Sequence, residues 1–247
     1  MTVKFRDEFL ANQRMLVISP HADDETYGCA GTIARVKSLG GEVYVLLVSV
    51  GDLAHYGDSS SGLPRNVVSQ RTRLDEFGNV MRLLKVDDWE VLFTDAATHL
   101  ALDALPRKQL IRLLESEARL SIDKLQPTMV MIPAISYNQD HEALFRAGLS
   151  ATRPGAPGQK YTVPFVLTYD NTSLFWSGDG TRFHPNVYID VSPFLEIKIG
   201  ALRMHASQVR GPLYHGSPEG LELATRARGR EASVEAAEGF CLLRGLF

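Results

Sequence analysis

A run of ionisable residues follows the first strongly apolar segment of the chain. Residues 15–19 form an apolar segment that ends in Ser19. Soon after it come the imidazole of His21 and the carboxylates of Asp23, Asp24 and Glu25. Holding four ionisable side chains at the tip of a buried strand costs free energy unless a cation or a reaction uses them. We therefore expect a metal site here, in which His21 and Asp24 bind the ion and Asp23 remains free.

A second apolar segment is followed by another candidate ligand. Residues 128–132 have the pattern of a buried strand, and His141 follows them at the start of a predicted helix. His21, Asp24 and His141 together would supply two nitrogens and one oxygen. This donor set suits a catalytic Zn²⁺ better than Mg²⁺ or Ca²⁺, which favour shells of oxygen atoms.

The residues beside these ligands extend the chemistry. Zinc lowers the pKa of a bound water toward ~7 and polarises a carbonyl oxygen. Asp23 could then take the proton of the water as a general base. Asp140 could orient a ligating imidazole, although capping of the following helix is an equal alternative. The pattern indicates metal-assisted hydrolysis of an acyl bond.

The elements that must position these residues alternate along the chain. The patterns predict strands at 15–19, 43–50, 90–93, 128–132 and 165–169, and helices at 28–39, 70–84, 107–125, from 192 or 193 to 205, and near 221–226. This order favours an α/β fold, a Rossmann-like, mostly parallel sheet with helices on both faces. Ligands of such sheets lie at the carboxyl ends of strands. We expect a single domain over 1–247, with a core over about 1–153 and a C-terminal elaboration over about 154–247.

Composition narrows the class of protein. The chain has 247 residues, 45% of them hydrophobic, and a net charge of −3. This favours a protein without nucleic-acid or membrane partners. Cys29 and Cys241 have no metal-finger spacing, residues 1–8 lack a signal-peptide core, and no apolar run reaches the roughly 20 residues of a membrane span. We expect a soluble, cytoplasmic protein.

Three further polar residues have less specific readings. Glu25 is either a ligand or a hydrogen-bonding partner of a neighbouring loop. Cys29 lacks a partner that would make it a nucleophile, so a packing role is favoured. Asp52 follows the strong strand 43–50, and capping or turn formation is its favoured role.

The segment Pro20–Glu25, together with Asp140 and His141, resembles the PIG-L/LmbE-like family of zinc-dependent N-acetylglucosaminyl deacetylases. Further resemblance lies in Arg73-x-x-Glu76, Phe183-His184-Pro185-Asn186, Lys198, Ser207-Gln208 and Ala237-Glu238-x-Phe240. It implies a Rossmann-like sheet with zinc at the strand tips.

The resemblance also implies roles for single residues. His21, Asp24 and His141 match the metal ligands, and Asp23 matches the general base. Arg73 matches an arginine associated with substrate hydroxyl groups; the alternative for Arg73 is a surface salt bridge with Glu76, three residues further on.

One departure concerns the second motif. Many members of the family carry a histidine where this chain has Asn138. An amide can donate a hydrogen bond to an oxyanion, but it cannot deliver a proton to a leaving amine. We therefore expect the proton to come from Asp23 or from another imidazole, His184 or His205, for both of which a structural role is the alternative.

The resulting hypothesis is a metal-dependent amidohydrolase that removes the acetyl group from a small-molecule N-acetyl amino sugar or its conjugate. Side chains available for stacking on a sugar are Tyr56, Arg153, Phe175 and Trp176. The rivals are a metal-retaining sugar-binding protein without catalysis and a Mg²⁺-binding receiver domain of signalling proteins. Members of this family often assemble, so homo-oligomer formation stays open.

Overall fold

The computed structural model describes residues 2–54, 67–156, 158–171, 183–209, 211–214 and 216–246. Its strands are β1 (Arg14–Ser19), β2 (Glu42–Ser49), β3 (Leu53–Ala54), β4 (Val67–Val68), β5 (Asp88–Phe93), β6 (Met129–Pro133), β7 (Phe165–Tyr169), β8 (Val187–Asp190) and β9 (Ala237–Gly245). Its α-helices are α1 (Thr2–Ala11), α2 (Asp24–Ser38), α3 (Gln70–Leu83), α4 (Arg107–Arg112), α5 (Ile122–Leu125), α6 (Gln139–Ala151), α7 (Leu195–Met204) and α8 (Pro218–Glu231).

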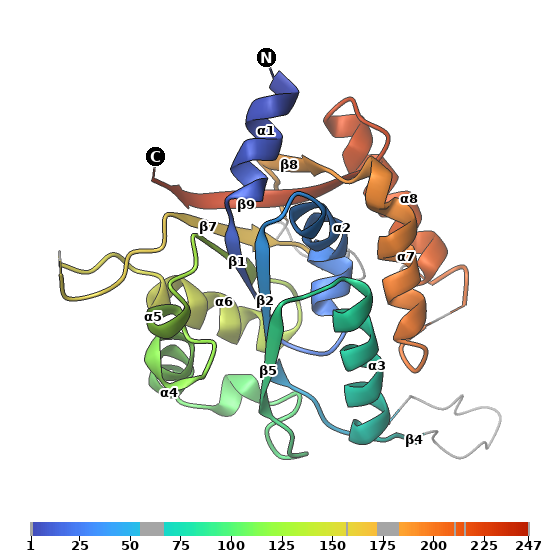
Figure 1. The fold of residues 1–247 in the computed structure, drawn as a ribbon. Helices are drawn as coiled ribbons and strands as arrows, with labels where there is room; N and C mark the ends of the chain where they lie inside the picture. Colours follow the sequence, from blue (N-terminus) through green and yellow to red (C-terminus); the bar gives the residue numbers. More distant parts are fainter. Residues whose placement is uncertain are drawn as a thin grey trace.

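Seven of these strands form one sheet in the order β5-β2-β1-β6-β7-β9-β8 (Figure 1). The first five are parallel, whereas β9 runs antiparallel between β7 and β8. The predicted Rossmann-like, mostly parallel α/β fold is confirmed. The last two strands were not expected, and they make the sheet mixed.

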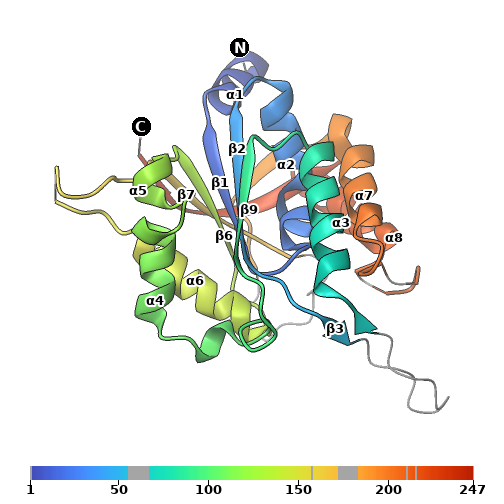
Figure 2. The ribbon, with the colours of Figure 1, turned by 60° about the horizontal axis from the view of Figure 1, so that its bottom comes forward.

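Helices cover both faces of the sheet, with α4, α5 and α6 on one side and α2, α3 and α7 on the other (Figure 2). Strand β1 explains the need for two layers. Met15 and Val17 point into the core beneath α2, while Leu16 and Ile18 point into the core beneath α6. A parallel strand that is apolar on both faces requires cover on both.

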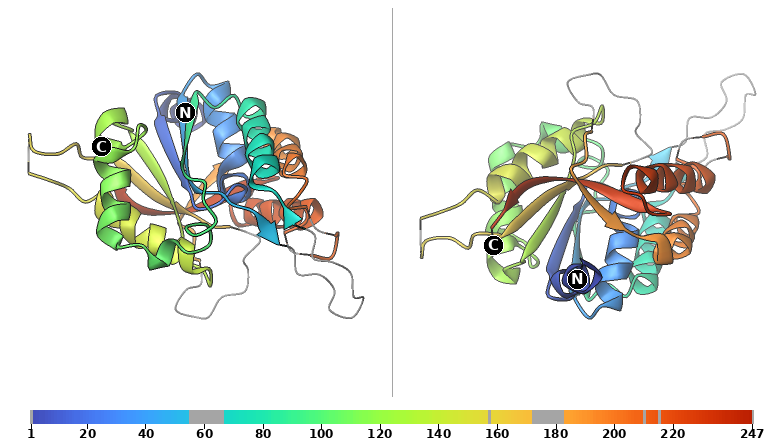
Figure 3. Two further views of the ribbon diagram at one scale, coloured as in Figure 1. Left: turned by 90° about the horizontal axis from the view of Figure 1, so that it is seen from below. Right: turned by 90° about the horizontal axis from the view of Figure 1, so that it is seen from above.

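The two views along the vertical axis show how the C-terminal half joins this core (Figure 3). Strands β8 and β9 lengthen the sheet, and α7 packs against α2, α3 and α8. The C-terminal half thus contributes strands to the same sheet as the N-terminal half. The division of the single domain into a core and a C-terminal elaboration stays a prediction.

The continuous helix predicted over 107–125 is wrong. Helix α4 ends at Arg112, a π-helical turn follows over Leu113–Glu117, and α5 begins at Ile122. Ala118 is extended, with ψ of 155°, and the next two backbone N–H groups donate to the carboxylate of Glu90 in β5, at 3.0 and 2.7 Å. Glu90 thus replaces the helical carbonyls as their acceptor.

Two helix boundaries also differ from expectation. Helix α2 begins at Asp24 rather than Gly28, so the acidic run lies in its first turn. Helix α8 is longer than the predicted 221–226 because Ser217 caps it and Pro218 is suited to its first position. Among the described helices, none is long and apolar enough to cross a membrane.

Candidate active site

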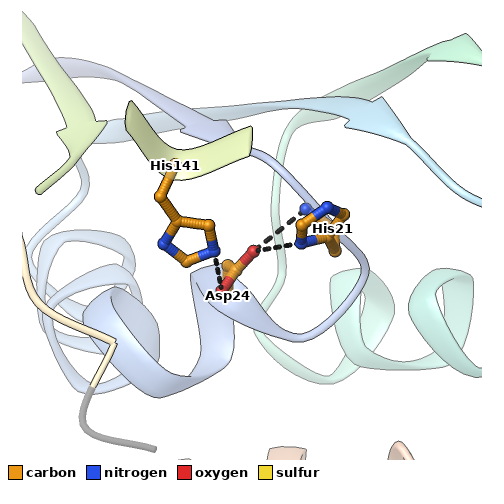
Figure 4. Close-up of side chains that lie close together, drawn as sticks. All are labelled: His21, Asp24 and His141. Carbon is orange, nitrogen blue, oxygen red and sulfur yellow. Dashed lines mark hydrogen bonds and ion pairs between the residues drawn. The ribbon is translucent and has the colours of Figure 1, made fainter. Parts of the chain in front are cut away.

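The two predicted ligand segments meet because their strands are neighbours. Strand β1 pairs in parallel with β6, with Leu16 opposite Val130, so both chains leave the sheet at the same edge. His21 and Asp24 follow β1 at the start of α2, and His141 lies in the first turn of α6. Figure 4 shows the three side chains converging from these elements.

One ligand atom from each residue of this triad lies within 4.8 Å of the other two. His21 Nδ1 is 3.3 Å from Asp24 Oδ2, and His141 Nε2 is 3.3 Å from Asp24 Oδ1. All three residues are buried. Within the described part of the chain, no other group of histidine, cysteine and acidic residues is arranged to hold a metal ion.

The ionisation of the triad favours a cation. Burial alone would raise the pKa of Asp24, but the two imidazoles hold it well below its usual range. Burial opposes protonation of His21, yet the hydrogen bonds that its ring donates to Asp140 and Asp24 raise its pKa to about 9. A metal ion would take the place of the proton held between these groups.

Asp140 settles which nitrogen of His21 faces the triad. Its Oδ2 lies 2.8 Å from His21 Nε2, and its Oδ1 accepts a hydrogen bond from Leu102 N at 2.9 Å. An ionised carboxylate can only accept, so Nε2 carries a proton and leaves Nδ1 toward Asp24. This is the arrangement in which a carboxylate orients a metal-binding imidazole.

Asp23 has an unusual backbone conformation. Its φ of 149° with ψ of −24° lies in a region that a residue with a Cβ rarely adopts. Its N–H donates to His21 O at 3.0 Å and to Glu25 Oε2 at 3.2 Å, which holds this conformation. Burial and the charge of Asp24 raise the pKa of Asp23 to about 7. A nearby divalent cation would lower this pKa.

Asn138 lies at the N-terminus of α6, where its Oδ1 accepts a hydrogen bond from Asp140 N at 2.9 Å. It is the N-cap of the helix that carries His141. The cap uses the oxygen of the amide, so only the NH₂ group can act as a donor.

Asn171, which the sequence did not reveal, lies against the triad. It follows β7, is buried, and its Nδ2 donates to Asp24 Oδ1. The strand before it was predicted, so its place at the end of β7 was the available signal. A lone asparagine after a strand is too common to single out.

Arg73 projects from α3 and is 3% exposed. Its Nη1 donates to Gly51 O at 3.0 Å and to His99 Nε2 at 2.7 Å. The alternative role of Arg73, a surface salt bridge with Glu76, is wrong because Arg73 is buried. Glu76 instead accepts hydrogen bonds from Ser207 N and Oγ at 2.8 and 2.6 Å. Burial lowers the pKa of Arg73.

His99, also missed from the sequence, completes this side of the site. Its ring lies edge-on to His21, with centroids 5.5 Å apart. Burial and the neighbouring Arg73 lower its pKa to about 4. It lies in the turn after β5, and only its place beyond a strand end could have drawn attention to it.

Glu25 is absent from the triad and instead binds its surroundings. Its carboxylate contacts Ser19 Oγ at 3.1 Å, Thr26 Oγ1 at 2.9 Å and His205 Nε2 at 3.1 Å. His205 is fully buried; its hydrogen bond with Glu25 outweighs burial and raises its pKa. His184 is exposed.

The remaining candidates lie apart from this cluster. Asp52 accepts a hydrogen bond from Gln70 N at 2.6 Å at the start of α3, Arg153 forms an ion pair with Glu115 at 3.2 Å, and Cys29 is a buried free thiol. Tyr56, Phe175 and Trp176 lie outside the described residues.

The chain is similar to several known proteins over nearly its whole length. A diacetylchitobiose deacetylase of Thermococcus kodakarensis is 25% identical over 253 residues, which cover 99% of this chain and 88% of the relative. The solved N,N'-diacetylchitobiose deacetylase from Pyrococcus horikoshii has 22% identity and a TM-score of 0.68, covering 94% of this chain and 84% of that one. The 4-carboxy-2-hydroxymuconate hydratase from Pseudomonas putida has 19% identity and a TM-score of 0.71, covering 94% and 97%.

The PIG-L family profile, described as GlcNAc-PI de-N-acetylase, matches residues 16–152. That segment holds most of β1, all of β6 and all three residues of the triad. The match spans more than half of the chain, and the chain belongs to the PIG-L family.

Proposed function

We propose that this protein is a zinc-dependent hydrolase that removes the N-acetyl group from an N-acetylated amino sugar or its conjugate. The observation that carries the proposal is the buried triad of His21, Asp24 and His141 with Asp23 beside it. The deacetylases of Thermococcus and Pyrococcus, which are named for an N-acetylated sugar substrate, support the choice of substrate class.

The triad fits zinc in both donor type and spacing. Two imidazole nitrogens and one carboxylate are a common catalytic zinc set. One ligand atom from each of the three residues lies within 4.8 Å of the other two, so all three could bind one ion. Such an ion would supply a water of lowered pKa and a Lewis acid for the acetyl carbonyl.

Asp23 is proposed as the general base that takes the proton of the attacking water. Its backbone is held in a sparsely populated conformation beside the triad, and such strain is concentrated at functional sites. Its carboxyl group could then return this proton to the leaving amine, which balances the reaction without a second acid.

The other candidate proton donors fit less well. His184 is exposed, and Nε2 of His205 faces Glu25 and Thr26 in the core. We propose that Asn138 donates its NH₂ to the developing oxyanion while its oxygen caps α6. Arg73 is proposed to bind substrate hydroxyl groups.

Metal content and acetate release test this proposal together. We expect about one zinc ion per chain and release of acetate from at least one compound in a panel of N-acetylated amino sugars and conjugates. The Asp23→Asn variant should keep the zinc and lose the release. Full deacetylase activity of Asp23→Asn would refute the role of Asp23 as general base. A protein that binds no zinc would refute the proposal that the triad is a zinc site.

The hydratase from Pseudomonas putida shares this fold, with a TM-score of 0.71, so hydration of an unsaturated acid is a second candidate reaction to test. The panel should therefore include 4-carboxy-2-hydroxymuconate. Zinc binding without any turnover would favour the sugar-binding alternative. Membership of the PIG-L family excludes the receiver domain.

We also infer that the protein is cytoplasmic and that its substrates are small molecules.

A further inference from the structure

His99 is a buried polar residue whose place in the proposed reaction is not yet accounted for. It is 7% exposed, and its ring meets that of His21 at an interplanar angle of 85°. It is not part of the metal-binding triad among the described residues. A histidine that lies so close to the triad without being one of its members needs another explanation.

The hydrogen bonds around His99 fix its protonation. A guanidinium only donates, so His99 Nε2 must accept the 2.7 Å bond from Arg73 Nη1. The ring is then neutral, with its proton on Nδ1, and donates to Ser49 Oγ at 3.3 Å. Ser49 in turn donates to Pro20 O at 3.3 Å. Each hydrogen bond of this chain is therefore donated in the same direction, from Arg73 through His99 and Ser49 to Pro20, the residue before His21.

The chain makes room for this ring. A Cβ added at Gly51 would lie 2.7 Å from His99 Cβ and 2.9 Å from two ring carbons. The carbonyl of Gly51 also accepts from Arg73 at 3.0 Å. Glycine at position 51 thus leaves room for the imidazole, and a larger residue would force the ring or the backbone to shift.

A neutral acceptor has a particular consequence for Arg73. In the described residues no carboxylate lies within ion-pair distance of this buried guanidinium, and its Nε has no hydrogen-bond partner. Asp23, Asp24 and Glu76 attract it only at longer range. An aspartate at position 99 would hold Arg73 by neutralising it, whereas an imidazole holds it and leaves its charge available to a bound group.

We propose that His99 is a positioning residue, which as a neutral imidazole fixes the guanidinium of Arg73 toward the substrate without neutralising it. This inference rests on the proposed function for the identity of the substrate, but the arrangement itself can be tested without turnover. His99 acts through Arg73 and does not touch the reacting atoms.

The kinetic test compares three changes at two positions. His99→Phe keeps the ring and removes the acceptor, so kcat/KM should fall by about 10–100-fold with zinc content unchanged. His99→Gln offers an amide oxygen to Arg73 and an N–H to Ser49, and should recover most of the loss. In an Arg73→Met background, His99→Phe should change kcat/KM by no more than about twofold, because the residue it acts through is gone.

A spectroscopic test does not depend on any substrate. With ¹⁵N-labelled histidine in the zinc-loaded protein, His99 should give the signals of a neutral ring protonated at Nδ1, and Nε2 should shift in Arg73→Met. Gly51→Ala should perturb the same signals. A proton on Nε2, or an unchanged Nε2 signal in Arg73→Met, would overturn the proposal even if no substrate is known. A full loss from His99→Phe in the Arg73→Met background would overturn it as well.

Discussion

Two clusters of buried charge contact the same helix, α2, and among the described residues only one of them could hold a metal ion. At its first turn lie Asp23 and Asp24 with the two imidazoles. The second cluster lies alongside residues 26–32 of the same helix, where Lys198 donates to Thr26 O, Tyr27 O and Glu238 Oε1 at 3.0, 2.7 and 2.5 Å.

The second cluster is closed. Lys198 is 1% exposed and uses its three donors, while Glu238 also accepts from Gly31 N and Thr32 N at 2.9 and 2.7 Å. No ligand is needed to complete it. In the first cluster, one potential ligand atom from each of three residues lies within 4.8 Å of the other two, and Asp23 is held in a strained conformation. The buried charges of the first cluster indicate function because their potential ligand atoms lie close enough to share a cation.

The largest expected effect is a loss of activity on substitution of Asp23, in the first cluster. Asp23→Asn removes the proposed base and should lower kcat by ~10²–10⁴-fold, the usual contribution of general base catalysis. The stability of the folded state should not fall, because a half-buried carboxylate in a crowded acidic site is replaced by a neutral amide. Acetate release and thermal unfolding on the same samples give both quantities. Loss of activity through unfolding would contradict the comparison.

The closed cluster should respond through stability instead. Lys198→Met leaves Glu238 buried without its counter-ion and should cost about 3–5 kcal/mol in the free energy of unfolding. The double variant Lys198→Met with Glu238→Gln should lose less, since no charge remains buried. Denaturant titrations measure both. An unchanged stability of Lys198→Met would show that the ion pair does not clamp α2.

A smaller effect is expected at Asp140, which contacts His21 of the metal-binding triad without belonging to it. Asp140→Asn can still accept from Leu102 N, but its NH₂ would face His21 Nε2 and favour a proton on Nδ1, where the metal should bind. We expect zinc affinity to fall by ~10–100-fold. Competition with a chelator measures this, with the exposed Asp103→Asn as the matched control. Equal affinities would refute the assigned tautomer.

The smallest effect concerns Asp170, which borders a small cavity also lined by Lys198 and Glu238. Burial raises its pKa to about 6, opposed by Arg228 at 3.8 Å. The unfolded chain releases this proton at lower pH, so the stability contributed by neutral Asp170 is lost as pH rises from about 4 to about 6.

Asp170→Asn removes this dependence. Above pH 6 the variant should be more stable than the parent by on the order of 2 kcal/mol, and the difference should vanish below about pH 4. Unfolding in denaturant across this range is the measurement. A parent that is more stable than the variant at pH 7 would show that Arg228 outweighs burial.

Much of the fold followed from local patterns. Apolar strands that alternate with amphipathic helices predicted the parallel part of the sheet, and the polar residues after β1 and β6 predicted where ligand atoms would meet. The helix over 107–125 failed because its break depends on Glu90 in a distant strand. Strand β9 was missed because helices α7 and α8 separate it in the sequence from β7 and β8, the strands with which it pairs.

The sequence by itself therefore determined the donor set, since residue type and place beyond a strand need only local information. The tertiary structure decided which partner each polar group has. His21 bonds Asp140 across 119 positions, Arg73 bonds His99 rather than Glu76, and Lys198 reaches α2 across more than 170. The free energy of a buried polar group depends on the partner it finds in space, and that partner is set by packing of the whole sheet.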